Sequence, residues 1–154
     1  MGSQEPHKKA SNTKDSPRGA SVKKPVTLRG GCFCGAVRYR CDASPDLVFC
    51  CHCLDCQRHS AGPFAFIVRV DAAALEITGK TQTYAYGAGG QGLIKHFCPI
   101  CGTRMLNEVA RFPDHRYLAG GTLDEGADMI PSMHIYTRRC VSWFTPNEGA
   151  DIHS

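Results

Sequence analysis

Cys98-Pro99-Ile100-Cys101-Gly102 carries two cysteines with two residues between them, and Cys32-Phe33-Cys34 carries two with one residue between them. The first spacing is typical of a turn that binds zinc. The second, in an extended backbone, directs both sulfurs to the same side. Four thiolates complete a tetrahedral zinc site. We therefore predict one structural zinc held by these four cysteines, which would stabilise the fold by joining segments far apart in the sequence.

A separate group of cysteines, Cys51, Cys53 and Cys56, has only three members. An extended backbone would direct Cys51 and Cys53 to one side and His52 to the other. Three thiolates leave one position of a tetrahedral ion open to water, a thiol or a substrate oxygen. These three cysteines could therefore hold a metal ion that still has room for one more ligand. If the segment is turned rather than extended, Cys50 could replace Cys51 as a ligand, because it lies three residues before Cys53.

The composition indicates one soluble domain of 154 residues, 42% of them hydrophobic, with no apolar run of membrane-spanning length. Residues 1–25 contain no hydrophobic signal segment and are rich in Lys, Ser, Pro and Gly. We expect a disordered arm and a cytoplasmic location, where reduction favours metal binding over disulfides. The predicted organisation is an arm at 1–25, a zinc-binding domain at 26–146 and a tail at 147–154.

The positive charge is concentrated in the arm, which has six basic and two acidic residues. Removing these from the chain's 18 basic and 14 acidic residues leaves 12 of each. A folded surface with this balance does not indicate a groove for nucleic acid. We expect the arm to be solvated rather than bound to nucleic acid or an acidic protein, and we expect no membrane partner.

Alternating apolar residues separated by turn residues predict a mainly β domain, and no segment has a sustained helical period. Strands are predicted at 37–41, 64–70, 81–86, 93–97, 104–109, 116–119 and 133–136. The remaining cysteines, Cys41, Cys50 and Cys140, have apolar neighbours and are expected to be buried. Trp143 and Phe144 are expected to anchor the core. The glycine-rich loop at 87–92 lacks a phosphate-binding signature.

Several ordered motifs resemble the glutathione-dependent formaldehyde-activating enzyme family, which also contains the centromere protein V domain. The resemblance covers about residues 28–144. The motifs are Gly31-Cys32-Phe33-Cys34-Gly35-Ala36-Val37-Arg38-Tyr39, Cys51-His52-Cys53-Leu54-Asp55-Cys56, Phe97-Cys98-Pro99-Ile100-Cys101-Gly102-Thr103, Gly121-Thr122-Leu123-Asp124 and Pro131-Ser132-Met133-His134-Ile135. The resemblance implies a single β-tent domain with two zinc ions, four cysteines on the structural ion and three on the catalytic one. It also implies that glutathione adds to formaldehyde to form S-hydroxymethylglutathione, the reverse of a carbon–sulfur lyase reaction.

Other polar residues are candidates for the remaining chemistry. Possible proton donors are His52, Asp55, His96 and Asp124, and structural hydrogen bonding is the alternative role for each. Possible partners for the carboxylates of glutathione are Arg58, Lys95, Arg104 and Arg139, with a solvated surface role as the alternative. The expected substrates are glutathione or another small thiol and a small aldehyde. Two other functions fit the sequence: a glutathione carrier without turnover, and a structural zinc module whose basic arm binds an acidic partner.

Overall fold

The computed structural model describes residues 26–86 and 92–154. The predicted disordered arm and most of the glycine-rich loop lie outside these described residues. The protein is mainly β, as predicted. Its elements are β1 (Leu28–Gly31), β2 (Arg38–Cys41), β3 (Leu47–Cys51), α1 (Leu54–Ser60), β4 (Ala65–Asp71), η1 (Ala72–Ala74), β5 (Leu75–Thr78), β6 (Gln82–Tyr86), β7 (Leu93–Phe97), β8 (Arg104–Val109), β9 (His115–Ala119), η2 (Gly120–Thr122), η3 (Gly126–Asp128), β10 (Met133–Ile135), η4 (Thr137–Arg139) and β11 (Asp151–Ile152).

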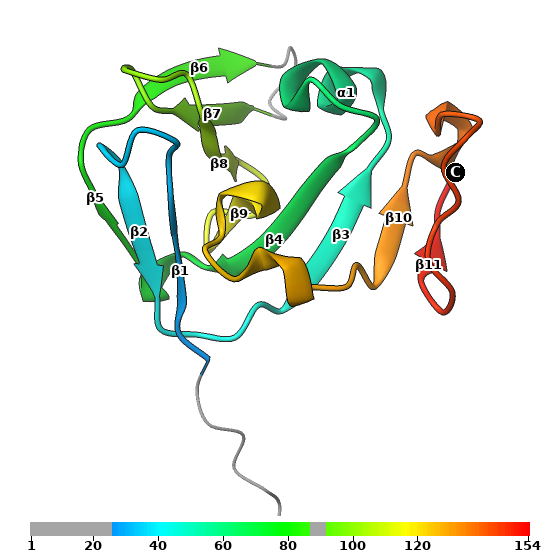
Figure 1. Cartoon of the computed structure of the whole chain (residues 1–154), viewed down its shortest axis with the longest axis horizontal. Coiled ribbons are helices and arrows are strands. Elements are labelled where there is room, and N and C mark those ends of the chain that lie inside the picture. Colours follow the sequence, from blue (N-terminus) through cyan, green and yellow to red (C-terminus); the bar gives the residue numbers. More distant parts are fainter. Residues whose placement is uncertain (1–25, 87–91) are drawn as a thin grey trace, which may run out of the picture.

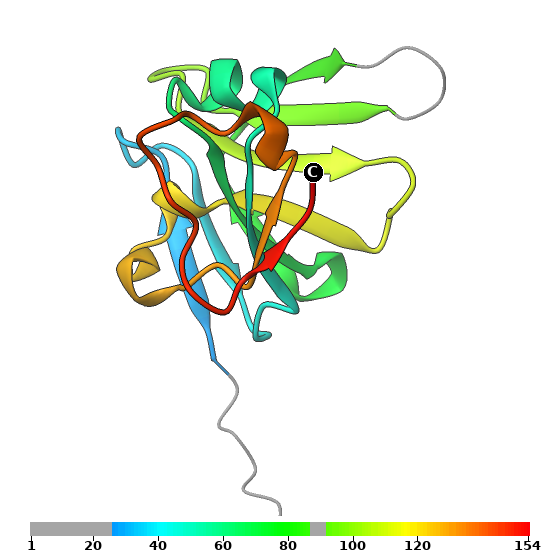
Figure 2. The same ribbon diagram turned by 90° about the vertical axis from the view of Figure 1, so that its right-hand side faces the viewer.

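The strands form two sheets (Figure 1). The larger has eight strands in the order β11-β10-β3-β4-β9-β8-β7-β6, and the smaller has three in the order β1-β2-β5. Most neighbours are antiparallel, but β10 pairs in parallel with both β3 and β11. Residues 147–154, expected to form a tail, therefore contribute β11 to the sheet. Figure 2 shows this C-terminal segment alongside β10.

The core lies on both faces of the larger sheet. On β4, Val68 and Val70 pack with the apolar residues of β1 and β2, while Ala65 and Ile67 face the other side and pack with residues of β3 and β9. All four side chains are buried, as the period-two alternation of a strand requires when both faces are covered. Burial of each large aliphatic side chain contributes about 1.5–3 kcal/mol to stability.

All seven predicted strands are present, with boundaries shifted by at most one residue. No helical period is visible in the sequence, yet residues 54–60 form the helix α1. This helix has seven residues, none of them buried, so no apolar stripe marks it in the sequence. None of the helices in the described parts of the chain is long and apolar enough to cross a membrane.

The C-terminal aromatic pair divides between the core and the surface. Trp143 is 73% exposed, so its predicted role as a core anchor is wrong. Phe144 is partly buried, and its ring packs in a tilted arrangement against Phe64 with 4.7 Å between the centroids, as expected for an anchor. Cys41 and Cys50 are buried as predicted, but Cys140 is only partly so. Cys140, Trp143 and Phe144 all follow the short 3₁₀ turn η4 in an irregular segment, so the burial of neighbouring side chains differs there.

Candidate functional site

Cys32, Cys34, Cys98 and Cys101 bring their sulfur atoms within 4.8 Å of one another. The Sγ of Cys34 lies 3.5 Å from that of Cys32 and 3.7 Å from that of Cys98. Tetrahedral zinc with bonds of about 2.3 Å separates its sulfur ligands by about 3.8 Å. The four thiols therefore have the arrangement needed to bind one zinc ion.

The two loops that carry these cysteines turn in the same way. The N–H of Gly35 donates to the carbonyl of Cys32, and the N–H of Gly102 donates to the carbonyl of Cys98. Gly35 and Gly102 have φ values of 77° and 73°, a left-handed conformation that favours glycine. Each glycine thus reverses the backbone directly beside a cysteine pair. Both loops lie at the upper left of Figure 1, on the side of β6 and β7, whereas α1 lies at the upper right.

Hydrogen-bond donors surround two of these sulfurs. The N–H of Val37 lies 3.2 Å from the Sγ of Cys32. The hydroxyl of Thr103 lies 3.2 Å from the Sγ of Cys101, and its hydrogen bond lowers the pKa of that thiol to about 5. Donors of this kind favour the thiolate, which is the form that binds a metal.

Cys51, Cys53 and Cys56 form the second group, also with sulfurs within 4.8 Å of one another. Cys51 ends β3, and its Sγ lies 3.6 Å from that of Cys53. Cys53 is the N-cap of α1, where its sulfur accepts from the N–H of Cys56 at 3.3 Å. The spacing again matches a tetrahedral ion, with one ligand fewer. Cys50 is 2% exposed and is not a member of the group.

The side chain of His52 points away from the sulfurs of its two neighbours. It is fully buried, and its Nε2 lies 2.9 Å from Nδ1 of His134 on β10. This agrees with the alternation expected of an extended segment. The structure therefore places His52 behind the three-cysteine group rather than beside its open side.

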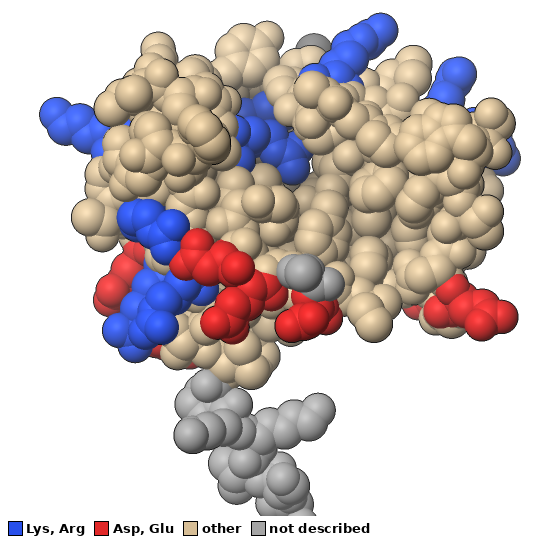
Figure 3. All heavy atoms as spheres, in the orientation of Figure 1, with Lys and Arg blue, Asp and Glu red and all other residues tan. Residues whose placement is uncertain are grey.

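Two cations lie close enough to the three-cysteine group to influence its charge. Lys95 on β7 is only 7% exposed, and burial lowers its pKa. Burial also lowers the pKa of Arg104 on β8, while the charge of Cys56 opposes both shifts. Within residues 26–86 and 92–154, neither cation forms an ion pair with a carboxylate. Figure 3 shows Lys and Arg atoms in a hollow between the end carrying β5–β7 and the end carrying α1.

The thiols of the three-cysteine group differ in their pKa values. A hydrogen bond from Cys51 is the main reason that the pKa of Cys56 falls to about 6, with further contributions from Cys53, Arg104 and Lys95. The same contact raises the pKa of Cys51. One thiolate in the group is therefore stabilised even before a metal supplies its positive charge.

Tyr86, on the edge strand β6, contacts side chains that lie near the three-cysteine group. The hydroxyl of Tyr86 on β6 donates to Asp55 in the first turn of α1 at 2.6 Å. Its ring lies 5.0 Å from the Nζ of Lys95 and packs edge-on against His59 at 6.3 Å. Asp55 and Lys95 are candidates from the sequence, whereas Tyr86 and His59 are not. No local pattern marks these two, since the residues they meet come from other elements.

The remaining candidates from the sequence lie elsewhere. His96 alternates with Lys95 along β7 and bonds to Thr81 and Glu108. Arg58 and Arg139 are exposed. Asp124 forms an ion pair with Arg38. Of the eight proposed proton donors and carboxylate partners, Asp55, Lys95 and Arg104 are thus grouped with the three cysteines, and His52 lies behind them.

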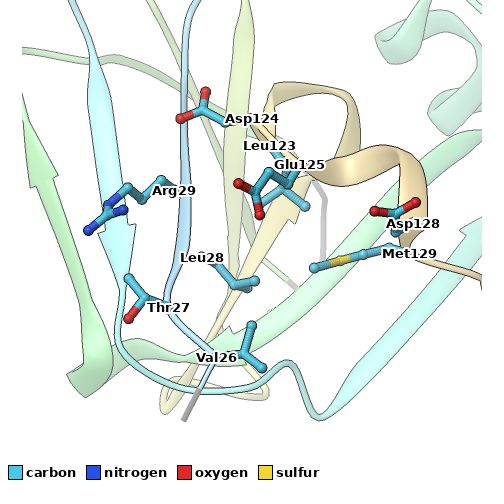
Figure 4. Close-up of a pocket in the computed structure, with 9 residues that line it drawn as sticks. All are labelled: Val26, Thr27, Leu28, Arg29, Leu123, Asp124, Glu125, Asp128 and Met129. Atoms are coloured by element: carbon cyan, nitrogen blue, oxygen red, sulfur yellow. The ribbon is translucent and has the colours of Figure 1, made fainter. Parts of the chain in front are cut away.

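Asp124 also lines a cavity of about 490 Å³ near the start of β1 (Figure 4). Glu125, Asp128 and Arg29 contribute further charges, and Leu28 and Met129 line it with apolar atoms. The lining contains no cysteine. The cavity therefore shares no lining residue with either group of thiols.

The fold and the two groups of thiols define a small β protein with two potential zinc sites, one of four cysteines and one of three. The chain belongs to the family of glutathione-dependent formaldehyde-activating enzymes, whose model matches residues 27–139. That range contains all seven grouped cysteines. The resemblance noted in the sequence is therefore confirmed.

Two individual proteins are similar to this chain. A Halomonas elongata protein named "Putative glutathione-dependent formaldehyde-activating enzyme" is 28% identical over 125 residues, covering 77% of this chain and 80% of the relative. A crystal structure of a Rhodobacter sphaeroides protein aligns with a TM-score of 0.48 and 16% identity, covering 82% of this chain and 99% of that one.

Proposed function

We propose that this chain joins glutathione to formaldehyde to form S-hydroxymethylglutathione, as a zinc-dependent enzyme of the carbon–sulfur lyase type. Membership of the family supports glutathione-dependent formaldehyde activation. The observation that carries the finer proposal is the three-thiol group, which is one ligand short of a closed zinc site. It lies beside Lys95 and Arg104, neither of which pairs with a carboxylate among the described residues. We assign Cys51, Cys53 and Cys56 to a catalytic zinc, and Cys32, Cys34, Cys98 and Cys101 to a structural one.

When bound by three thiolates, zinc supplies a fourth position that can accept a thiol sulfur and remove its proton. In the overall reaction the sulfur forms a bond to the aldehyde carbon, the carbonyl π electrons move to oxygen, and that oxygen gains a proton. Nothing is oxidised or reduced. A free thiol with a pKa of about 8.5 is roughly 3% ionised at pH 7, so full ionisation accelerates the reaction at most about thirty-fold. Larger effects require side chains that position the substrates and deliver the proton.

Lys95 and Arg104 are suited to hold the anionic thiol substrate. Three thiolates outweigh the charge of a zinc ion by one, and an incoming thiolate adds another negative charge. Two cations without carboxylate partners among the described residues would offset that charge and bind the substrate's carboxylates, Arg104 by a two-point contact. Arg58 and Arg139 receive no such role, because both are exposed.

The Tyr86–Asp55 pair is suited to deliver the proton. Its hydrogen bond of 2.6 Å orients the hydroxyl, and Asp55 raises the pKa of Tyr86. The hydroxyl therefore remains protonated at neutral pH and can donate. Asp55 is one of the four possible proton donors that the sequence offers. His96 and Asp124, two of the others, have partners elsewhere.

The proposal is tested by the zinc content per chain before and after mild chelation, with calorimetric titration of glutathione and of S-methylglutathione. We expect two zinc ions, one of them labile, and binding of glutathione with little binding of the blocked thiol. Exchange NMR of formaldehyde and glutathione then measures turnover. Binding without accelerated exchange would identify a carrier. One resistant zinc without thiol binding would overturn the proposal and favour a structural zinc module.

A further inference from the structure

A buried network of hydrogen bonds lies behind the three-cysteine group. Nε2 of His52 lies 2.9 Å from Nδ1 of His134, and Nε2 of His134 lies 2.8 Å from Oδ1 of Asn147. The amide nitrogen of Asn147 donates to the carbonyl of Pro131 at 3.0 Å. The two histidines are at most 1% exposed. The network therefore runs from the C-terminal segment, across β10, to the loop between Cys51 and Cys53.

The contacts of the Asn147 side chain determine which atom donates and which accepts in each hydrogen bond of the network. Since its amide nitrogen faces a carbonyl, its oxygen faces His134 and must accept, so Nε2 of His134 carries the hydrogen. A neutral imidazole then has a bare Nδ1, which accepts from Nε2 of His52. The remaining nitrogen of His52, Nδ1, is therefore also a bare acceptor. It is buried and has no partner among the described residues.

Such an orphaned acceptor is costly, and packing does not require it. The ring of His52 lies 5.4 Å from Phe64 and 5.5 Å from Phe144, in surroundings that a phenyl ring would also fill. A histidine at this position destabilises the fold relative to a well-packed hydrophobe. The interaction that only histidine provides here is the hydrogen bond to His134.

The backbone of His52 is also held on both sides. Its N–H donates to the carbonyl of Ile135 at 3.0 Å, and its carbonyl accepts from the side chain of Gln57 at 2.7 Å. Because neighbouring side chains in an extended segment point in opposite directions, fixing His52 on one side fixes Cys51 and Cys53 on the other. The backbone contacts set the position of the loop, and the ring contact sets its rotation.

We infer that His52, His134 and Asn147 are positioning residues for the three-cysteine metal site. They orient two of its three sulfurs through the alternation of the backbone and do not touch the metal or the substrate. This inference rests on the proposed role of Cys51, Cys53 and Cys56 as ligands. It adds that the C-terminal segment, some 90 residues further along the chain, is needed for the geometry of that site.

The test is titration of the metal-free full chain with cobalt(II), whose absorption reports the geometry of a thiolate site. The spectrum of the four-cysteine site alone is obtained from a chain with all three of Cys51, Cys53 and Cys56 replaced by serine, and is subtracted. We expect Asn147→Leu and His134→Leu to alter the three-cysteine spectrum and to weaken its cobalt affinity about tenfold to a hundredfold. The four-cysteine site should not change.

Conservative variants separate positioning from simple destabilisation. Asn147→Asp retains the acceptor for His134, and His134→Gln offers one acceptor and one donor, so both should recover much of the spectrum and affinity. Tyr39→Phe is the matched control, because it removes a partly buried hydrogen bond of 2.9 Å between Tyr39, which lies on the smaller sheet, and Thr122. It should leave the three-cysteine spectrum unchanged.

His52→Phe gives the sharpest comparison. A packing role predicts equal or higher thermal stability and an unchanged spectrum, which would overturn the inference. A positioning role predicts an altered spectrum and weaker cobalt binding in a chain that still melts cooperatively. A parent chain that binds only one cobalt ion would overturn the proposed function and this inference together. Two ions with unchanged spectra in every variant would overturn the inference alone.

Discussion

Tyr86 donates its hydroxyl to Asp55 at 2.6 Å, which joins the edge strand β6 to the first turn of α1 across 31 positions of the sequence. Asp55 directly precedes Cys56, so this bond connects the sheet edge to the three-cysteine group. The same ring lies over the Nζ of Lys95. One side chain thus links the candidate ligands, a cation and a carboxylate.

Replacement of Tyr86 by phenylalanine should slow the exchange of formaldehyde with glutathione by about tenfold to a hundredfold, because the proton donor is lost. Zinc content and glutathione binding should be retained. Exchange NMR with the zinc-loaded protein measures the rate. Tyr84→Phe is the control, since Tyr84 lies on the same strand, is 55% exposed and has no hydroxyl hydrogen bond among the described residues. Equal rates in the two variants would remove Tyr86 from the mechanism.

Replacement of Asp55 by asparagine should shift the alkaline limit of activity to lower pH. The carboxylate raises the pKa of Tyr86, so the hydroxyl keeps its proton to higher pH in the parent protein. Without that charge the hydroxyl loses its proton earlier as the pH rises. A difference titration at the tyrosinate absorption band, against the same protein with Tyr86→Phe, would detect the shift. A limit that moves upward or stays in place would contradict this assignment.

Lys95→Met and Arg104→Met should each weaken glutathione binding about tenfold to a hundredfold, the range for losing a hydrogen bond to a charged group. The thermal stability of Lys95→Met should be equal or higher, because Lys95 is a buried cation that pairs with no carboxylate in the described parts of the chain, and such a charge is costly. Isothermal calorimetry and thermal melting measure the two quantities. Arg58→Gln and Arg139→Gln are matched controls for charge, since both arginines are exposed. If these controls lose as much affinity, a general charge effect is responsible.

The two groups of cysteines should differ in their consequences for folding. Cys98→Ser should abolish cooperative unfolding, since structural zinc contributes on the order of 10 kcal/mol, more than a domain of this size can lose. Cys56→Ser should leave a folded chain with one zinc. Circular dichroism and elemental analysis distinguish these results, with Cys140→Ser as the control for thiol loss outside both groups. Equal unfolding by Cys56→Ser would show that both sites are structural.

Phe144→Ala should lower the free energy of unfolding by about 2–4 kcal/mol, and Trp143→Ala by less than about 0.5 kcal/mol. Phe144 packs against His52, Phe64 and His134, whereas Trp143 is 73% exposed. Denaturant unfolding of the zinc-loaded protein measures both values. If Trp143→Ala lowered the free energy of unfolding more than Phe144→Ala does, Trp143 rather than Phe144 would be the residue that packs into the core.

The cysteine groups could be predicted because their geometry is local. A spacing of two in an extended segment, or of three in a turn, directs both sulfurs of a pair to one side whatever the rest of the chain does. The choice between Cys50 and Cys51 was left open because it depends on where β3 ends. The helix α1 was missed because its cap is a cysteine and its apolar stripe is absent.

The sequence by itself determined a mainly β domain and the division of seven cysteines into four and three, since both depend on periodicity and spacing within short segments. Only the tertiary structure decided which charged residues surround the three-cysteine group. Lys95 and Tyr86 reach it through the pairing of β6 and β7, and His134 lies behind it through the pairing of β10 with β3. Such contacts depend on which strands become neighbours and in what register, and that is set by burial of the whole core rather than by residues close in sequence.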